Sequence, residues 1–197
     1  MTIRTFLTYT LLFAVSGTLG SQTTTELLKE FAGRIAVAPA LEANFLWNET
    51  VSGTMVLQGD KFFIRMDEFS IYCNGTEKWY YNEGIDQWET LPHDRNSTEI
   101  LDNPSAFFSR LDKDFYQSGT PVRKESRQGI SLWELTLVPL SIESPFTYVI
   151  IQMTVDNLNP FFIRYALSDG SEYSIELLSF KSVPARPSGF FSPDISL

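Results

Sequence analysis

The sequence predicts an α+β protein in which an up-and-down antiparallel sheet is accompanied by two short amphipathic helices. Short apolar runs that alternate with polar residues recur along most of the 197 residues. Turn signals separate these runs at intervals of about 8–14 residues, as in a meandering antiparallel sheet. In two short stretches the apolar period changes to that of a helix. With 43% hydrophobic and 14% aromatic residues, the chain can fill a core and is not disordered.

The first helix is predicted over residues 25–36, and it ends before Pro39. Thr23–Thr25 offer an N-cap, and Glu26 follows in the first turn. The apolar residues of one helical face are Leu27, Leu28, Phe31 and Ile35. Strands are then predicted over Leu41–Asn48 and Val51–Gln58.

The stretch Gly53–Pro92 predicts a meander of short strands broken by turns. Asn74-Gly75 between two alternating runs predicts a hairpin with a type I′ turn, which needs positive φ at both central residues. Several of these strands carry apolar residues on both faces, so protein or a ligand must cover each face. The aromatic residues concerned are Phe62, Phe63, Phe69, Tyr72, Trp79, Tyr80, Tyr81 and Trp88.

The second helix is predicted to start at Asn103-Pro104-Ser105, after the polar loop His93–Asn103. With only about ten residues it is too short to be stable alone. It must therefore dock its apolar face, which is formed by Phe107, Phe108, Leu111 and Phe115.

The remaining chain predicts more antiparallel strands and an irregular end. Val122–Arg127 is charged, as in an edge strand. The alternating residues of the strands that follow are Trp133, Leu135, Leu137, Val149, Ile151, Met153, Val155, Phe161, Ile163, Tyr165, Leu167, Tyr173, Ile175 and Leu177. The tail Val183–Leu197 contains three prolines, with Phe190 and Phe191 as anchors.

The first 20 residues have the pattern of a secretory signal, with Arg4 as the only charge before the apolar run Phe6–Val15. The alternative is a packed or disordered N-terminal helix. Residues 21–197 are then expected to form a single domain. No apolar run reaches the ~18 residues of a membrane-spanning helix. The net charge of −9 without a basic run argues against binding to nucleic acid or anionic lipid surfaces.

Catalytic and metal chemistry have little support in the sequence. The chain has one histidine, His93, and one cysteine, Cys73, which cannot form a zinc site by themselves. A catalytic triad would have to use His93, which lies in a polar loop beside Asp94 and Arg95 with no nucleophile elbow nearby, so a triad is not expected. Cys73 is expected to be a small buried residue. No glycine-rich phosphate loop is present. We therefore expect a protein without catalytic residues, metal or cofactor, and a hydrolase with a carboxylate pair stays as an alternative.

Several segments, in their order along the chain, resemble one known family. Ser52–Leu57 is similar to a "G-x-l-x-l" strand, Lys61-Phe62 to a "K/R-F" position and Asn74–Tyr81 to a "D-G-x-x-x-W-x-Y" hairpin, which is the most specific piece. The later segments are Pro104–Leu111 (a Pro-led helix), Leu135–Pro139 ("L-x-L-x-P"), Asp169-Gly170 with Ile175 and Phe180 (a late hairpin) and Phe190–Pro193 ("F-x-x-P"). Together they resemble the periplasmic outer-membrane lipoprotein carrier family, LolA. "GDKF" at residues 59–62 looks like its Bacteroidetes-type members.

One position departs from the family pattern. Well-known members carry Arg-Pro just after the "G-x-l-x-l" strand, and that arginine latches the helices that act as a lid. Here Gln58-Gly59 or Gly59-Asp60 stands in its place. A latch formed by that arginine is therefore not expected in this chain.

The resemblance implies an incompletely closed antiparallel β-barrel, or half-barrel, capped by short helices, with a hydrophobic cavity for lipoprotein acyl chains. It implies a monomeric periplasmic chaperone that receives lipidated lipoproteins from the inner-membrane lipoprotein-releasing ABC transporter and hands them to an outer-membrane acceptor, where one exists. Phe62 has a second implied role, as a rim contact for that exporter. The expected acyl-chain-binding residues are Met55, Phe62, Ile64, Trp79, Tyr81, Phe107, Phe108, Leu111, Trp133 and Leu135. The alternatives are a secreted β-rich module for another apolar ligand, or a protein with a solid core and no ligand.

Overall fold

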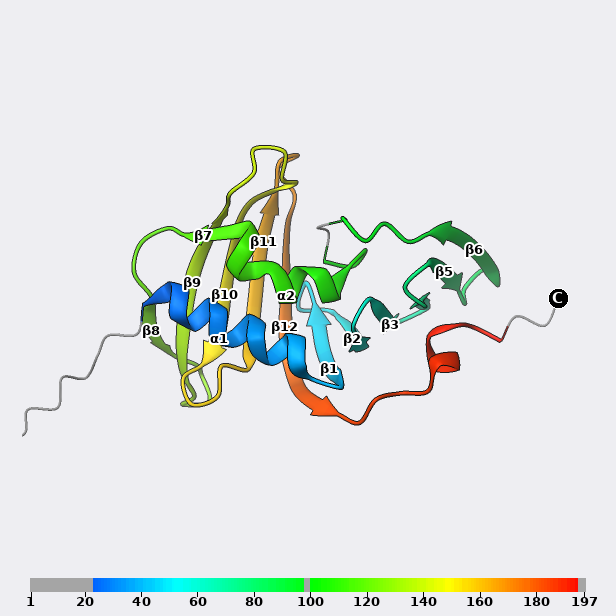
Figure 1. Cartoon of the computed structure of the whole chain (residues 1–197), viewed down its shortest axis with the longest axis horizontal. Helices are drawn as coiled ribbons and strands as arrows, with labels where there is room; N and C mark the ends of the chain where they lie inside the picture. Colours follow the sequence, from blue (N-terminus) through cyan, green and yellow to red (C-terminus); the bar gives the residue numbers. More distant parts are fainter. Residues whose placement is uncertain (1–22, 98–99, 195–197) are drawn as a thin grey trace, which may run out of the picture.

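One antiparallel sheet of twelve strands dominates the computed structural model, which describes residues 23–97 and 100–194. The order of hydrogen-bonded strands is β6-β5-β4-β3-β2-β1-β12-β11-β10-β9-β7, and β8 also pairs with β9 (Figure 1). The strands are β1 (Ala40–Trp47), β2 (Val51–Gln58), β3 (Lys61–Met66), β4 (Phe69–Cys73), β5 (Glu77–Asn82), β6 (Gln87–Pro92), β7 (Phe115–Gln117), β8 (Val122–Glu125), β9 (Ser131–Pro139), β10 (Phe146–Thr154), β11 (Pro160–Leu167) and β12 (Glu172–Val183). Because β6 and β7 do not pair with each other, the barrel stays open. The predicted half-barrel is confirmed.

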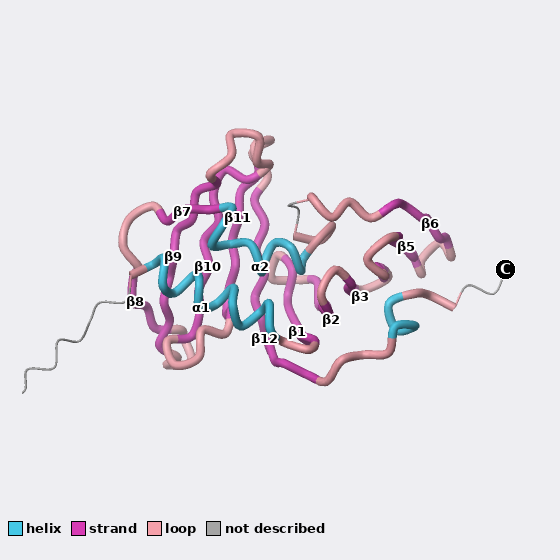
Figure 2. The backbone as a smooth tube through the Cα atoms, viewed as in Figure 1, coloured by secondary structure: helices cyan, strands magenta, loops and turns pink. Residues whose placement is uncertain are grey.

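The first and the last strand of the chain pair at the middle of this sheet. β1 and β12 are antiparallel, with Ala43 opposite Phe180 and Trp47 opposite Ile175, and the register shifts between Asn44 and Phe45. A bulge of this kind bends a strand and increases its twist. The pairing joins the meander β2–β6 to the longer strands β9–β11 (Figure 2).

Two helices, α1 (Thr24–Val37) and α2 (Pro104–Asp114), lie next to each other across the concave side of the sheet (Figure 1). The Thr23 hydroxyl accepts from the Glu26 amide and the Glu26 carboxylate accepts from the Thr23 amide, which completes a capping box. Asn103 caps α2, whose first residue is a proline. Both predicted helices are therefore confirmed. Neither helix in the described part of the chain is long and apolar enough to cross a membrane.

The hairpin predicted at Asn74-Gly75 is present, but its predicted turn type is wrong. The Asn74 amide donates to the Glu77 carbonyl, so Gly75 and Thr76 are the two central residues. Of these only Gly75 has positive φ, at +91°, so the type I′ turn, which needs positive φ at both central residues, is not formed. The Asn74 side chain accepts from the Thr76 and Glu77 amides, which fixes it before the turn.

The convex face of β2–β4 is covered by the C-terminal tail of the chain. After β12 the tail crosses below the meander and ends in the short 3-10 helix η1 (Ser188–Phe191) (Figure 1). Phe191 is fully buried, and the ring of Phe190 lies 5.6 Å from that of Phe63 on the convex side. The two tail anchors predicted from the sequence are thus both in contact with protein, and the tail provides a cover for one aromatic face of the meander.

Candidate functional site

The concave face of the sheet is set by the alternation of side chains along each strand. The register places Met55 opposite Ala43 on one side and opposite Ile64 on the other, and Ile64 opposite Ile71. The next row along the strands contains Leu57, Phe62 and Cys73. Cys73 is fully buried, as predicted, and burial raises the pKa of its thiol. These rows form the apolar floor under the two helices.

Most of the residues expected to bind acyl chains lie together in this interior. Seven of them belong to one buried apolar cluster and are no more than 5% exposed, and an eighth, Trp133, packs against that cluster while partly buried. The seven are Met55, Phe62, Ile64, Phe107, Phe108, Leu111 and Leu135. Their acyl-chain role stays a prediction. The second role of Phe62 as a rim contact does not fit this structure, because its side chain is 0% exposed.

Trp79 and Tyr81 are not brought to this interior. They alternate along β5 with Lys78 and Tyr80, and the register places Lys78 in the row of Cys73 on the concave face. Tyr81 instead stacks on Trp88 of β6, with ring centroids 4.4 Å apart, on the convex side. The sequence pattern failed here because β5 is aromatic at three consecutive positions, so the alternation does not show which face is inside.

Among the described residues, side chains of both helices and of the sheet pack together in the interior. From α1 the residues Leu27, Leu28 and Phe31 enter the same cluster as Phe107 and Phe108 of α2. A gap of about 10 Å³ is left where Met55 and Ile64 meet the loop before α2, and Phe45, Ile100, Leu101, Pro104 and Ile175 complete its lining. A gap of that size is close to the lower limit for a single water molecule. An apolar ligand in this interior would therefore have to displace the helices.

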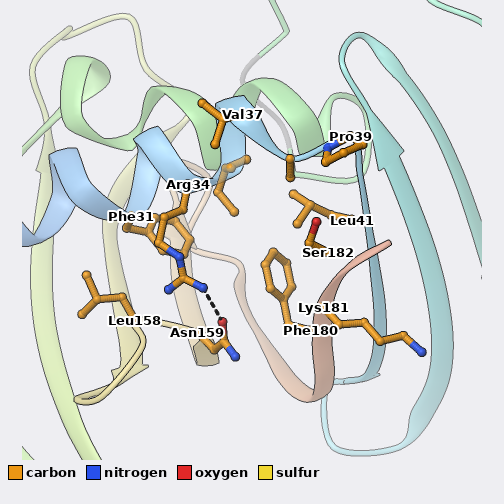
Figure 3. A pocket seen from close by; sticks show the side chains of 12 residues that line it. Phe31, Arg34, Val37, Pro39, Leu41, Leu158, Asn159, Phe180, Lys181 and Ser182 are labelled. Carbon is orange, nitrogen blue, oxygen red and sulfur yellow. Dashed lines mark hydrogen bonds between the residues drawn. The ribbon is translucent and has the colours of Figure 1, made fainter. Parts of the chain in front are cut away.

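An open pocket of about 260 Å³ lies between the C-terminal half of α1 and the end of β12 (Figure 3). Most of its lining is apolar. Arg34 of α1 is at its edge, and its Nη2 donates to Asn159 Oδ1 over 3.3 Å. The Lys181 ammonium is turned away from the pocket and pairs with Glu42 at 2.8 Å. The lining residues are Phe31, Arg34, Ile35, Val37, Ala38, Pro39, Leu41, Leu158, Asn159, Phe180, Lys181 and Ser182.

A group of three phenylalanines separates this pocket from the buried interior. The ring of Phe108 lies 6.3 Å from that of Phe31 and 6.0 Å from that of Phe180. Phe31 and Phe180 face the pocket, whereas Phe108 is fully buried. A second open pocket, of about 210 Å³, adjoins the first along Ile35, Ala38 and Leu41, beneath the same end of α1.

Sequence reasoning missed this pocket because its parts are far apart in the chain. It is formed by the ranges 31–41, 158–159 and 180–182, of which only the first helix gave a local signal. The one local feature of the pocket in the sequence is a cation beside an apolar residue, Arg34 next to Ile35, in the last turn of an amphipathic helix. No spacing rule connects that turn with Phe180.

The loop of residues 93–103, here called the lid loop and described except for 98–99, leads from β6 into α2. It is attached to the concave side of β5 by an ion pair between buried Lys78 and partly buried Asp102. The Tyr80 hydroxyl donates to the same carboxylate at 3.4 Å. His93 at the start of the loop lies edge-on to Phe62, and its burial together with the Lys78 charge lowers the pKa of its imidazole. The lid loop thus holds α2 over the sheet partly through charged groups.

Within the described ranges no group of three or more His, Cys, Asp or Glu side chains is placed to hold a metal ion. His93 lies edge-on to Phe62, and the charges of Lys78, Asp60, Arg95 and Asp94 act on its imidazole. The arrangement offers apolar surface and one cationic edge.

Comparisons with known proteins identify the fold. No protein-family model matches the chain, and no curated protein matches it in sequence. An uncharacterised conserved protein of Thermus thermophilus is similar in structure, with a TM-score of 0.57 at 10% identity over 87% of this chain and 93% of that chain.

Two further structures are similar at lower scores. A LolA superfamily protein of Nitrosomonas europaea has a TM-score of 0.46 at 12% identity, over 88% of this chain and 99% of that chain. An outer-membrane lipoprotein-sorting protein domain of Vibrio parahaemolyticus has a TM-score of 0.49 at 10% identity, over 85% and 95%. At such identities the likeness extends to the fold, and this chain shares the half-barrel fold of the Thermus thermophilus protein.

Proposed function

We propose that this protein is a non-enzymatic carrier of acyl chains, and that its cargo is lipoproteins on their way from the inner to the outer membrane. The ordered sequence motifs described above support the lipoprotein cargo, as does the predicted signal, which lies outside the described residues. In this proposal the carrier works in the periplasm. It receives cargo from the inner-membrane lipoprotein-releasing transporter and passes it to an outer-membrane acceptor.

The observation that supports the proposal best is the chemistry of the contact between helices and sheet. Leu27, Phe31, Phe108 and Leu111 are at most 1% exposed and meet the sheet through apolar surface. Such contacts have no fixed direction, so an acyl chain can replace them. Burial of each methylene contributes roughly 0.8 kcal/mol, so one long chain gains on the order of 10 kcal/mol. That gain can offset the displacement of the helices.

In the proposed mechanism the open pocket is the entrance. A chain enters between Phe31 and Phe180, displaces Phe108 and spreads along the floor of Met55 and Ile64 as α1 and α2 move away from the sheet. Release is the reverse movement, in which the helices refill the interior. The helices must therefore be only marginally stable in their closed position, as is usual for lids.

The first experiment compares a substitution of Leu111 in α2, which covers the interior, with the same substitution of Leu132 in β9. Leu111→Ser should reduce capture of a lipidated substrate at least tenfold, because a hydroxyl then lines the path of the acyl chain. Leu132→Ser is the matched control, since Leu132 is equally buried but does not belong to the interior cluster. Capture is measured by co-purification after mixing with detergent-solubilised lipoprotein, with folding checked by circular dichroism. Unchanged capture by folded Leu111→Ser and Phe108→Ser would contradict the proposal.

A second experiment identifies the cargo. Native mass spectrometry of the protein purified from its own periplasm should show added masses of lipidated polypeptide. Another apolar ligand at that position would support the wider carrier function and exclude the lipoprotein cargo. A protein without any added mass, which also takes up no lipidated substrate in solution, would indicate a solid core with no ligand.

A further inference from the structure

The charge around the open pocket differs from that of the chain as a whole. The chain has 24 acidic and 15 basic residues. The twelve residues that line the pocket contain two basic residues and no acidic one. Of the two, Lys181 is paired with Glu42, which leaves Arg34 as the cation at the pocket edge. An acidic protein thus presents a locally positive edge at the entrance to its apolar interior.

Arg34 is available to a ligand. Among the described residues its guanidinium bonds to the neutral Asn159 amide and has no carboxylate within ion-pair distance. A guanidinium carries five N–H donors in a planar fork that matches a carboxylate or a phosphate. Figure 3 shows Arg34 beside Phe31 and directed toward Asn159, at the same end of the pocket as Leu158. A negative group bound there would have apolar surface next to it.

We propose that the open pocket selects acyl compounds whose polar end is anionic, with the anionic group on Arg34 and the hydrocarbon chain between Phe31 and Phe180. This inference rests on the proposed acyl-chain function and specifies the chemistry of the ligand. The pocket volume of about 260 Å³ lies just below the range of about 300–1,000 Å³ usual for small-molecule sites, so it fits one chain before the helices move. The negative group can belong to a fatty acid or to an acidic residue next to the acylated end of a peptide.

The test compares ligands that share a chain and differ in charge. Isothermal titration calorimetry is performed with decanoate below its critical micelle concentration and with decanol below its solubility limit. Wild-type protein should bind decanoate roughly tenfold more tightly than decanol, since hydrogen bonds to charged groups are the stronger ones. Arg34→Gln should reduce decanoate affinity to that of decanol and leave decanol unchanged. Arg127→Gln, which removes an exposed arginine away from the pocket, should keep the tenfold preference.

A second pair of ligands distinguishes the two sources of the negative group. These are palmitoylated peptides that carry either aspartate or asparagine next to the acylated residue. An Arg34-dependent preference in the fatty-acid pair, in the peptide pair or in both supports the inference and names the source. Equal affinity within both pairs overturns the inference and leaves the carrier function standing, because acyl chains still bind. Absence of binding by all four ligands overturns both.

Discussion

The ring of Phe45 leaves no room for a side chain at Gly53 of β2. A Cβ at this position would lie 2.2 Å from a ring carbon of Phe45, its cross-strand partner on β1. Phe45 is 2% exposed, so its ring has little room to move. We expect Gly53→Ala to lower the free energy of unfolding by about 1–3 kcal/mol, the usual cost of overpacking.

Gly33 of α1 provides the matched comparison, because a Cβ there meets nothing within 4 Å. Gly33→Ala should raise the free energy of unfolding by about 1 kcal/mol, the helix propensity difference between the two residues. Urea denaturation of both variants measures the contrast. A Gly53→Ala variant as stable as the wild type would contradict the close packing of Phe45 on Gly53.

His93 predicts a pH dependence of stability. The pKa of its imidazole is lowered from the ordinary 6.5 by burial and by the Lys78 charge, against the weaker attraction of Asp60. Neither ring nitrogen has a hydrogen-bond partner among the described residues. The unfolded chain therefore takes up the proton first, so the stabilisation is complete above pH 6.5 and is lost as the pH falls through the folded pKa.

This dependence is measured by thermal unfolding between pH 7.5 and 5.5. Wild-type protein should lose stability over that interval, and His93→Gln should lose less because its amide does not titrate. Parallel curves for the two proteins would rule out His93 as the titrating group. Carboxylates contribute mainly at lower pH, which keeps them outside the window.

The pair of Lys78 and Asp102 ties the element β5 to the lid loop. The side chain of Lys78 is 5% exposed and that of Asp102 is 24% exposed. Lys78→Met leaves a carboxylate without its cation, and we expect a loss of about 3 kcal/mol of stability, the lower end for broken buried pairs because Asp102 is partly solvated. Lys78→Met combined with Asp102→Leu should recover most of that loss.

Chemical denaturation of the single and double variants measures this coupling. A double variant as unstable as Lys78→Met would mean that the ion pair itself, rather than the isolated charge, decides stability. Hydrogen exchange in α2 gives a second readout, because weaker attachment of the lid loop should reduce protection there.

The helices and strands of this chain could be predicted from its sequence better than the contacts between them. Both helices and the strand pattern follow from local signals, such as the capping box at Thr23 and the Asn103-Pro104 start of α2, and the structure confirms them. The helical spacing of Phe115 places it on the face of the second helix, whereas in the structure it begins the short strand β7. The face to which each side chain points is harder to predict. On β5 the sequence alone does not show whether Trp79 or Lys78 lies on the side that the helices cover. The pocket could not be predicted, since residues 34 and 180 meet only through the pairing of β1 with β12.

At the scale of the whole molecule, the C-terminal tail stabilises the sheet by packing on its convex face. Arg186 pairs with Glu42 at 2.7 Å and its amide donates to Gln58, and Phe191 then enters a fully buried site. Phe191→Ala should lower the free energy of unfolding by about 3–5 kcal/mol, as expected for a buried phenylalanine. Phe190→Ala is the control and should cost clearly less, because Phe190 is 37% exposed. Guanidinium denaturation measures both variants. Equal losses in the free energy of unfolding would contradict a stabilising role of the buried Phe191 side chain.

The pairing of β1 with β12 has a consequence for biosynthesis. On the ribosome β1 emerges long before its partner, so a nascent chain that stops short of residue 172 lacks the central strand of the sheet. Contacts this distant along the chain form slowly. The sheet therefore stays incomplete, with the meander not yet joined to β9–β11, until β12 has left the ribosome.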